Sequence, residues 1–244
     1  MLAVSTLTAV PVRVTWPDGD RTDAPGYYPL VGLALGGIAF GLVQLANALS
    51  WTDRAPLVVS VGVLAFFALA TRMLHWDGLA DVFDAMWTSD RERALEIMRD
   101  SATGAFGVTA IVLSVVAQTA ALAQLVTDGR SWVLLVVPVF GRLAATFGAW
   151  FGRPARTDGL GASVIGRPRV GALVPVALIV ALCVALGVVA GGAAGVWLSV
   201  GGMLLALAVP HLFALRFGGV TGDVMGASVV VVEAVLLAIL AVTL

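Results

Sequence analysis

Long uninterrupted runs of apolar residues constrain this chain more than any other feature of its sequence. They lie at residues 28–49, 57–74, 106–127, 132–151, 171–191, 193–213 and 227–244. Most are close to the length of about 20 residues that a helix needs to cross a bilayer. Lipid offers no partners to a free backbone group, so such runs must be helical. With 60% hydrophobic and 12% charged residues, the sequence predicts an all-α polytopic membrane bundle. We expect about seven transmembrane helices in a single domain over residues 1–244.

The arginines between these runs predict the orientation. If the N-terminus is cytoplasmic, only Arg54 and Arg130 lie outside and Arg142 lies within a run. Eleven then lie on the inner side: Arg13, Arg21, Arg72, Arg91, Arg93, Arg99, Arg153, Arg156, Arg167, Arg169 and Arg216. The positive-inside rule therefore predicts a cytoplasmic N-terminus. The N-terminus lacks a basic region followed by an apolar core, so we expect no cleaved signal peptide.

Two counts narrow the chemistry further. All basic residues are arginine, whose planar fork suits phosphate groups, although a GC-rich coding bias explains the same pattern. The single cysteine, Cys183, excludes a disulfide framework and a cysteine-based zinc site. Nothing in the sequence points to nucleic-acid binding.

Three aspartates lie close together in HWDGLADVFDAMW, residues 75–87. If the helix of the second run continues through residue 84, Asp77, Asp81 and Asp84 fall at i, i+4 and i+7 on one face. Carboxylates gathered in this way suit Mg²⁺, which shares its remaining ligand positions with water and phosphate oxygens. The alternative is a solvated helix end whose acids pair with nearby arginines.

Two later segments have the composition of phosphate-binding helix starts. IMRDSATGAFG, residues 97–107, offers Arg99, Asp100 and Ser101 before the third run, with Ser101 and Thr103 as candidate helix caps. An ordinary capped helix start is the alternative. Just upstream, SDRERALEIMRD predicts a short amphipathic helix capped by Ser89 or Asp90, lying on the membrane surface or against the bundle.

The second of these segments is FGGVTGDVMGA, residues 217–227, which places Thr221 and Asp223 in a Gly-rich entry to the last run. An Arg-rich loop, residues 152–169, adds Arg153, Arg156 and Asp158.

Two polar residues in or beside the apolar runs are also candidates for the site. Arg142 lies inside the fourth run and predicts a polar cavity or an acidic partner, either Asp77 or Glu233, unless it forms a purely structural ion pair. His75 lies beside the carboxylates and could orient a substrate, act as a base or serve only as a hydrogen-bonding neighbour.

The order of these motifs resembles a known family. HWDGLADVFDAMW, RALEIMRDSATGAFG, GRLAA, DGLGA and GGVTGDVMGA follow one another as in the cobalamin synthases, the adenosylcobinamide-GDP ribazoletransferases. STLTAVPV and YYPLVG, near the start, are similar to the N-terminal segment of that family.

The resemblance implies an integral membrane enzyme that depends on Mg²⁺. It joins α-ribazole, or its 5'-phosphate, to adenosylcobinamide-GDP and releases GMP. By the same resemblance, Asp77, Asp81 and Asp84 are the catalytic and metal-binding residues. Two of them would hold Mg²⁺ and the third would position or deprotonate the attacking group. The expected substrate-binding residues are His75, Arg99, Asp100, Ser101, Arg142, Arg153, Arg156, Asp158, Thr221 and Asp223. The expected partners are the two substrates, the lipid bilayer and either a second copy of the chain or other enzymes of the corrinoid pathway.

Two other functions remain open from the sequence. The DG and later acids also resemble the CDP-alcohol phosphotransferases, but their signature has Arg after the Ala, whereas Asp81 follows Ala80 here. A cation-coupled transporter would need acids at mid-bilayer on several helices, and only Glu233 and Arg142 lie within the apolar runs.

Overall fold

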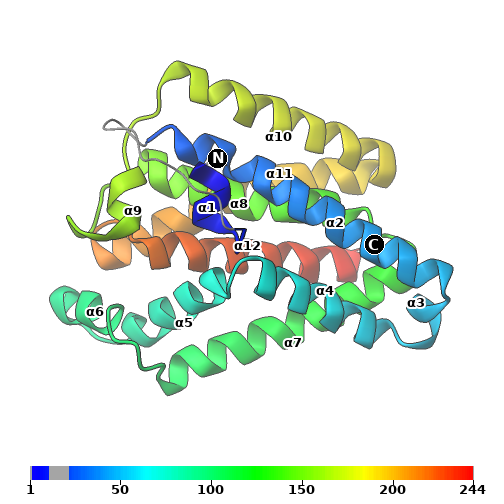
Figure 1. The fold of residues 1–244 in the computed structure, drawn as a ribbon, viewed down its shortest axis with the longest axis horizontal. Coiled ribbons are helices and arrows are strands. Elements are labelled where there is room, and N and C mark those ends of the chain that lie inside the picture. Colours follow the sequence, from blue (N-terminus) through cyan, green and yellow to red (C-terminus); the bar gives the residue numbers. More distant parts are fainter. Residues whose placement is uncertain (1, 11–21, 244) are drawn as a thin grey trace.

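The computed structural model describes residues 2–10 and 22–243, and every regular element in these ranges is a helix (Figure 1). Arg13 and Arg21 lie outside the described residues. In chain order the elements are α1 (Leu2–Leu7), the 3-10 helix η1 (Ala24–Tyr27), α2 (Tyr28–Ala48), α3 (Trp51–Arg54), α4 (Pro56–Ala70), α5 (Leu74–Met86), α6 (Arg91–Ile97), α7 (Ala105–Thr127), α8 (Val133–Phe151), α9 (Gly159–Val164), α10 (Val170–Gly191), α11 (Ala193–Phe217) and α12 (Gly222–Thr243).

The long helices confirm the predicted membrane bundle. Among the described residues, six spans are long and apolar enough to cross a bilayer: η1 with α2, α7, α8, α10, α11 and α12. The boundary expected between the runs 171–191 and 193–213 is present, because α10 ends at Gly191 and α11 begins at Ala193. The last span begins at Gly222 rather than at residue 227, so it is longer than the sequence indicated.

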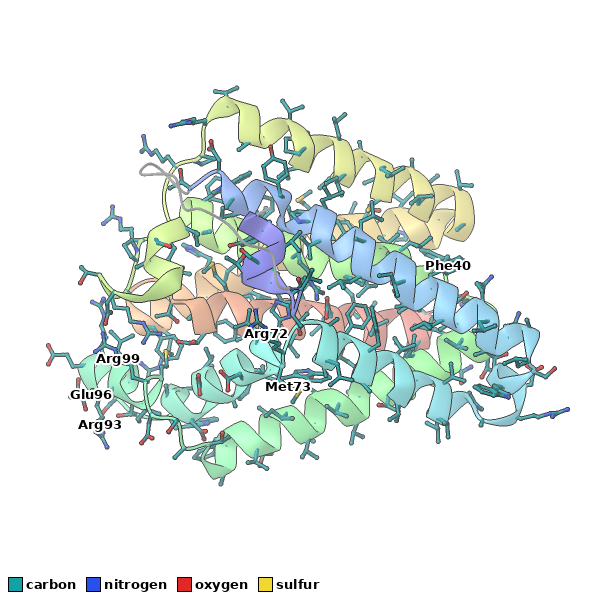
Figure 2. All side chains as sticks on the ribbon, viewed as in Figure 1. Phe40, Arg72, Met73, Arg93, Glu96 and Arg99 are labelled. Carbon is teal, nitrogen blue, oxygen red and sulfur yellow. The ribbon has the colours of Figure 1, made fainter. Side chains whose placement is uncertain are left out.

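The expected span at residues 57–74 is broken. The prediction that its helix continues through residue 84 is therefore wrong. Helices α4 and α5 meet at an angle of 89°. Arg72 and Met73, between them, have the positive φ values of 53° and 61° that end a right-handed helix. The Arg72 guanidinium donates to the carbonyl of Thr8, at 3.0 Å, rather than to an aspartate. Figures 1 and 2 place the break partway along the bundle, so Arg72 does not lie in an end loop.

Helix α8 forms the centre of the bundle and packs against α2, α11 and α12. Its Phe140 and Leu143 side chains are fully buried. Gly36 on α2 lets the two backbones meet closely, because a Cβ there would lie 2.1 Å from the Leu134 carbonyl oxygen. Small residues at helix contacts commonly permit this approach in membranes.

One end of the bundle carries most of the charged side chains, and we call it the polar end. It contains the last turns of α5, α8 and α11, the first turns of α7, α10 and α12, and the short helices α6 and α9 (Figure 1). Figure 2 shows Arg93, Glu96 and Arg99 gathered there. The predicted helix α6 is confirmed, since the Asp90 side chain caps it by accepting from the Glu92 amide. Ala94 and Met98 are buried, so α6 packs against the bundle.

Candidate active site at the polar end of the bundle

A cavity of about 480 Å³ opens at the polar end. Seven of the predicted site residues line it: His75, Asp77, Arg99, Arg156, Asp158, Thr221 and Asp223. They come from α5, α12 and the loops before α7, α9 and α12, so motifs separated by about 150 residues in sequence meet at one cavity. Thr6, Leu7 and Tyr28 also line the cavity, although residues of these types are too common in membrane helices to indicate a site. The similarity of STLTAVPV and YYPLVG to the family was the only signal for them.

The motif HWDGLADVFDAMW reaches the cavity because α5 packs unusually close to the start of α12. Gly78 makes this possible, since a Cβ at that position would lie 2.7 Å from the Asp223 carbonyl oxygen. Asp77, Asp81 and Asp84 share α5 at the predicted spacing, although the break separates them from α4. Asp77 is exposed and lines the cavity, whereas Asp81 and Asp84 are half-buried and do not.

Thr221 and Asp223 organise the first turn of α12. The buried Thr221 hydroxyl accepts from the Val224 amide at 3.1 Å and donates to the Asp223 carboxylate at 3.2 Å. Arg156 forms an ion pair with the same carboxylate. Asp223 is therefore fixed in direction from two sides.

The Arg-rich loop reaches Asp223 because its backbone pairs with the Gly-rich loop. Val220 donates to the Arg153 carbonyl at 2.7 Å, and Ala155 donates to the Val220 carbonyl at 3.0 Å. Gly161, in the DGLGA motif, lets α9 approach the start of α12, because a Cβ there would lie 2.5 Å from the Gly222 nitrogen.

The carboxylate of Asp84 binds the start of α7. It accepts from the Gly104 amide at 2.7 Å and from the Gly107 amide at 2.8 Å. A helix start offers free amides and a partial positive charge, and a carboxylate satisfies both. The expectation that Ser101 and Thr103 cap this helix is wrong. The N-cap residue is Gly104, which has no side chain, and the Asp84 carboxylate binds the free amides instead. The predicted phosphate cradle is thus filled by the protein itself.

The remaining residues of the two loops lie at the rim of the cavity or outside it. The Arg99 guanidinium pairs with both oxygens of Asp158, at 2.8 and 2.9 Å, across the mouth of the cavity. The Asp100 carboxylate accepts from the Ala102 amide at 3.0 Å. Asp100, Ser101 and Arg153 are exposed and do not line the cavity, so the structure does not bring them together with the other candidates.

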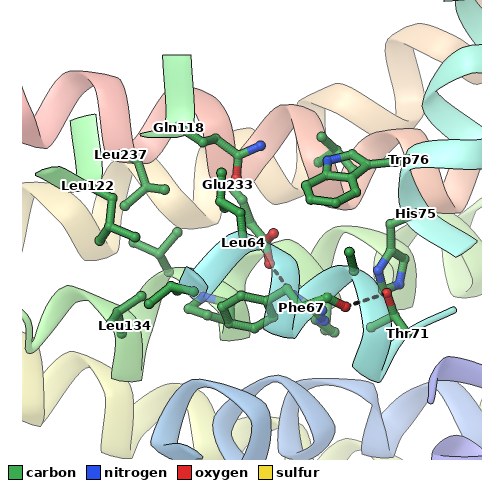
Figure 3. A pocket seen from close by; sticks show the side chains of 16 residues that line it. Leu64, Phe67, Thr71, His75, Trp76, Gln118, Leu122, Leu134, Glu233 and Leu237 are labelled. Atoms are coloured by element: carbon green, nitrogen blue, oxygen red, sulfur yellow. Dashed lines mark hydrogen bonds and ion pairs between the residues drawn. The ribbon is translucent and has the colours of Figure 1, made fainter. Parts of the chain in front are cut away.

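Arg142 lies in a second, smaller cavity deeper in the bundle (Figure 3). Its guanidinium pairs with Glu233 on α12, which was one of its two expected partners. Asp77, the other expected partner, lines the larger cavity instead. His75 lines both cavities and therefore forms part of the wall between them.

The carboxylates around α5 determine whether the site suits a divalent cation. Within residues 2–10 and 22–243, no three Asp, Glu, His or Cys side chains already surround a common metal position. Half-buried Asp81 nevertheless lies within electrostatic reach of three carboxylates, those of Asp223, Asp77 and Asp84, whose repulsion Arg156 offsets only in part. Such repulsion favours a cation, and Mg²⁺ is commonly held by one or two carboxylates together with water and phosphate oxygens. The donor set fits a magnesium ion of this kind.

Comparison with known proteins decides the family. The family described as cobalamin-5-phosphate synthase matches residues 1–241. The chain belongs to this family. Proteins named adenosylcobinamide-GDP ribazoletransferase are similar over most of their length. The one from Frankia casuarinae is 35% identical over 99% of this chain and 94% of its own. Those from Pseudomonas entomophila and Syntrophobacter fumaroxidans are 36% and 39% identical, over 95% and 86% of this chain and 93% and 83% of theirs.

No solved structure matches the chain. Membership of the cobalamin-5-phosphate synthase family favours the resemblance found in the sequence over a CDP-alcohol phosphotransferase or a transporter.

Proposed function

We propose that this chain is an adenosylcobinamide-GDP ribazoletransferase. It joins α-ribazole, or α-ribazole 5'-phosphate, to adenosylcobinamide-GDP and releases GMP. One observation carries the proposal: the family motifs, scattered along the sequence, meet at a single cavity that combines carboxylates with two arginines. A pyrophosphate that must be gripped and cleaved requires this combination.

The residues divide into those that hold phosphate and those that hold a cation. Arg156 and Arg99 offer guanidinium forks to the pyrophosphate of the GDP group. Asp77 and Asp81 would hold a magnesium ion, which when bound neutralises charge that develops on the departing phosphate. Asp223, directed by Arg156 and Thr221, would position or deprotonate the attacking group. Asp84 positions the start of α7 rather than contacting substrate.

We also propose that the polar end faces the cytoplasm of a bacterium, from the inner membrane. The distribution of arginines supports this orientation. Arg54 and Arg130 lie at the opposite end of the bundle, whereas the arginines of α6, of the two loops around α9 and of the end of α11 lie at the polar end. Association with a second copy of the chain, or with other corrinoid-pathway enzymes, remains a prediction.

The activity can be tested directly in membranes that contain the protein. With adenosylcobinamide-GDP, α-ribazole 5'-phosphate and Mg²⁺, we expect GMP to be released, and chelation of Mg²⁺ with EDTA should stop the release. Membranes without the protein provide the control. If GMP release does not exceed that control, the proposed reaction is wrong; if it persists in EDTA, the magnesium assignment is wrong.

A further inference from the structure

The second cavity lies among α4, α5, α7, α8 and α12, close to the break between α4 and α5. Its volume is about 40 Å³. Figure 3 shows His75, Trp76, Gln118 and Glu233 around it, among apolar neighbours such as Leu122 and Leu237. A polar group in such a place must be hydrogen-bonded, because lipid and apolar side chains offer it nothing.

Two buried polar atoms on this wall have no hydrogen-bond partner among the described residues: Nε2 of His75 and Nε of Arg142. The exposed fractions of the two residues are only 6% and 1%. The Arg142 guanidinium uses Nη1 to bind Glu233, which leaves Nε free. A buried donor without a partner costs roughly 1–3 kcal/mol, so two on one small cavity call for a common explanation.

The neighbouring polar side chains donate elsewhere. Gln118 donates to the Ser114 hydroxyl at 2.8 Å, and Thr71 donates to the Phe67 carbonyl at 2.8 Å. Neither side chain forms a hydrogen bond with Nε2 of His75 or Nε of Arg142. The partner must therefore be small and able both to donate and to accept, because it faces a guanidinium donor, an imidazole and a carboxylate.

Water meets these conditions. A cavity volume on the order of 10–15 Å³ holds one water molecule, provided that the water finds two to four polar partners. The cavity is therefore large enough for about three, and too small for a nucleotide or a lipid chain.

We infer that the second cavity is an internal water site, in which water bonds to Nε2 of His75 and to Nε of Arg142 beside Glu233. The ion pair of Arg142 and Glu233 thus fixes the position of the water, and the water fixes the orientation of the His75 imidazole. Because His75 also lines the larger cavity, the water acts on the active site without contacting substrate. His75 is on this account a positioning residue. The positioning role of His75 rests on the proposed function, whereas the water site itself does not.

Two histidines make the site accessible to solid-state NMR. The chain has only His75 and His211, so in the variant His211→Gln the signals of ¹⁵N-labelled histidine belong to His75. In protein reconstituted in lipid bilayers, we expect transfer of magnetisation from water to Nε2, which is distinguished from Nδ1 by its bonded Cδ2. Absence of transfer to Nε2 in this otherwise unmodified protein would overturn the inference.

A cavity-filling pair of variants tests the location of the water. Ala68 lines the second cavity, so Ala68→Leu should displace the water and reduce the Nε2 transfer to background. Ala208 lines an apolar cavity of about 430 Å³ between α8 and α11, so Ala208→Leu should leave the transfer unchanged. Equal loss in both variants, or loss in neither, would contradict the assignment to this cavity. If Ala68→Leu does not fold, the Nε2 signal of the His211→Gln protein with Ala68 intact still decides.

Kinetics then test the positioning role. Ala68→Leu should lower kcat about tenfold and leave KM nearly unchanged, because misplacing a group at the reacting centre affects the chemical step more than binding. Unchanged kcat would contradict positioning by water. A wild-type protein that shows the NMR signal but releases no GMP would refute the proposed reaction and leave the water site standing.

Discussion

At the scale of single residues, the three aspartates of α5 differ in what their carboxylates contact. Asp77 points into the larger cavity, Asp81 lies among like charges, and both oxygens of Asp84 accept from backbone amides of α7. The helical spacing placed all three on one face, and spacing alone cannot distinguish a catalytic carboxylate from one that caps a neighbouring helix.

This difference predicts opposite behaviour for two substitutions. Asp77→Asn should abolish GMP release and change thermal unfolding little, because Asp77 is exposed and an exposed charge in the first turn of a helix contributes less than about 1 kcal/mol. Asp84→Ala should lower the free energy of unfolding by about 1–2 kcal/mol, the usual value for a lost helix cap, and retain part of the activity. Activity assays and thermal unfolding in detergent check both. An inactive Asp84→Ala protein of wild-type stability would show that Asp84 acts in the chemistry instead.

At the scale of elements, the ends of the helices at the polar end are completed by side chains from other elements. Arg216, at the end of α11, donates to the Met86 carbonyl at the end of α5 and to the Thr88 carbonyl. Arg91, on α6, donates to the Phe217 and Gly218 carbonyls that end α11. Free carbonyls at a helix end attract cations in this way. The two arginines therefore tie α6 to the bundle reciprocally.

Removing one of these ties should loosen α6 locally. Arg216→Ala is expected to speed amide hydrogen exchange in residues 87–98, because the contacts of Arg216 to the Met86 and Thr88 carbonyls, which hold the start of this segment, are lost. Arg93→Ala is the matched control, since Arg93 is exposed and pairs with Glu96 on the surface of α6. Mass-spectrometric hydrogen exchange measures both. Similar exchange in the two variants would show that burial of Ala94 and Met98 alone holds α6 in place.

The break between α4 and α5 shows where prediction from sequence reached its limit. Apolar runs located the membrane helices, since length and hydropathy act locally. Thr71, Arg72 and Met73 contain neither glycine nor proline, and a positive φ at such residues is uncommon. The break is stabilised by contacts from a distant segment: Ala9 donates to the Ala70 carbonyl at 2.7 Å, and Arg72 binds Thr8. Nothing within the run itself indicates these contacts.

At the scale of the whole molecule, the site too combines features that are local in sequence with contacts between distant segments. Carboxylates and arginines beside apolar runs are costly without a function, so the sequence could indicate the charged residues that line the larger cavity. Their convergence depends on Gly78 and Gly161, at which two backbones meet. A glycine in the sequence does not reveal which distant backbone approaches it, so the separation of Arg142 from the other candidates could not be foreseen either.

Orientation is also a property of the whole molecule, and the single cysteine makes it measurable. In a Cys183→Ser background, Ser89→Cys at the polar end should react with a membrane-impermeant maleimide only in inverted vesicles. Asp128→Cys, after α7 at the opposite end, should react in intact spheroplasts. Both residues are exposed, so a lack of reaction cannot be attributed to burial. The reverse pattern of labelling would place the polar end outside the cytoplasm.

The caps shared between helices have a consequence for biogenesis. The end of α5 is completed by an arginine of α11, and α12 supplies Asp223 and other residues that line the cavity together with Asp77. A chain still emerging from the ribosome therefore holds the early aspartates in the membrane well before their partners exist. Synthesis must reach the final helix before any competent site forms, so a nascent or truncated chain has no means of turning over substrate prematurely.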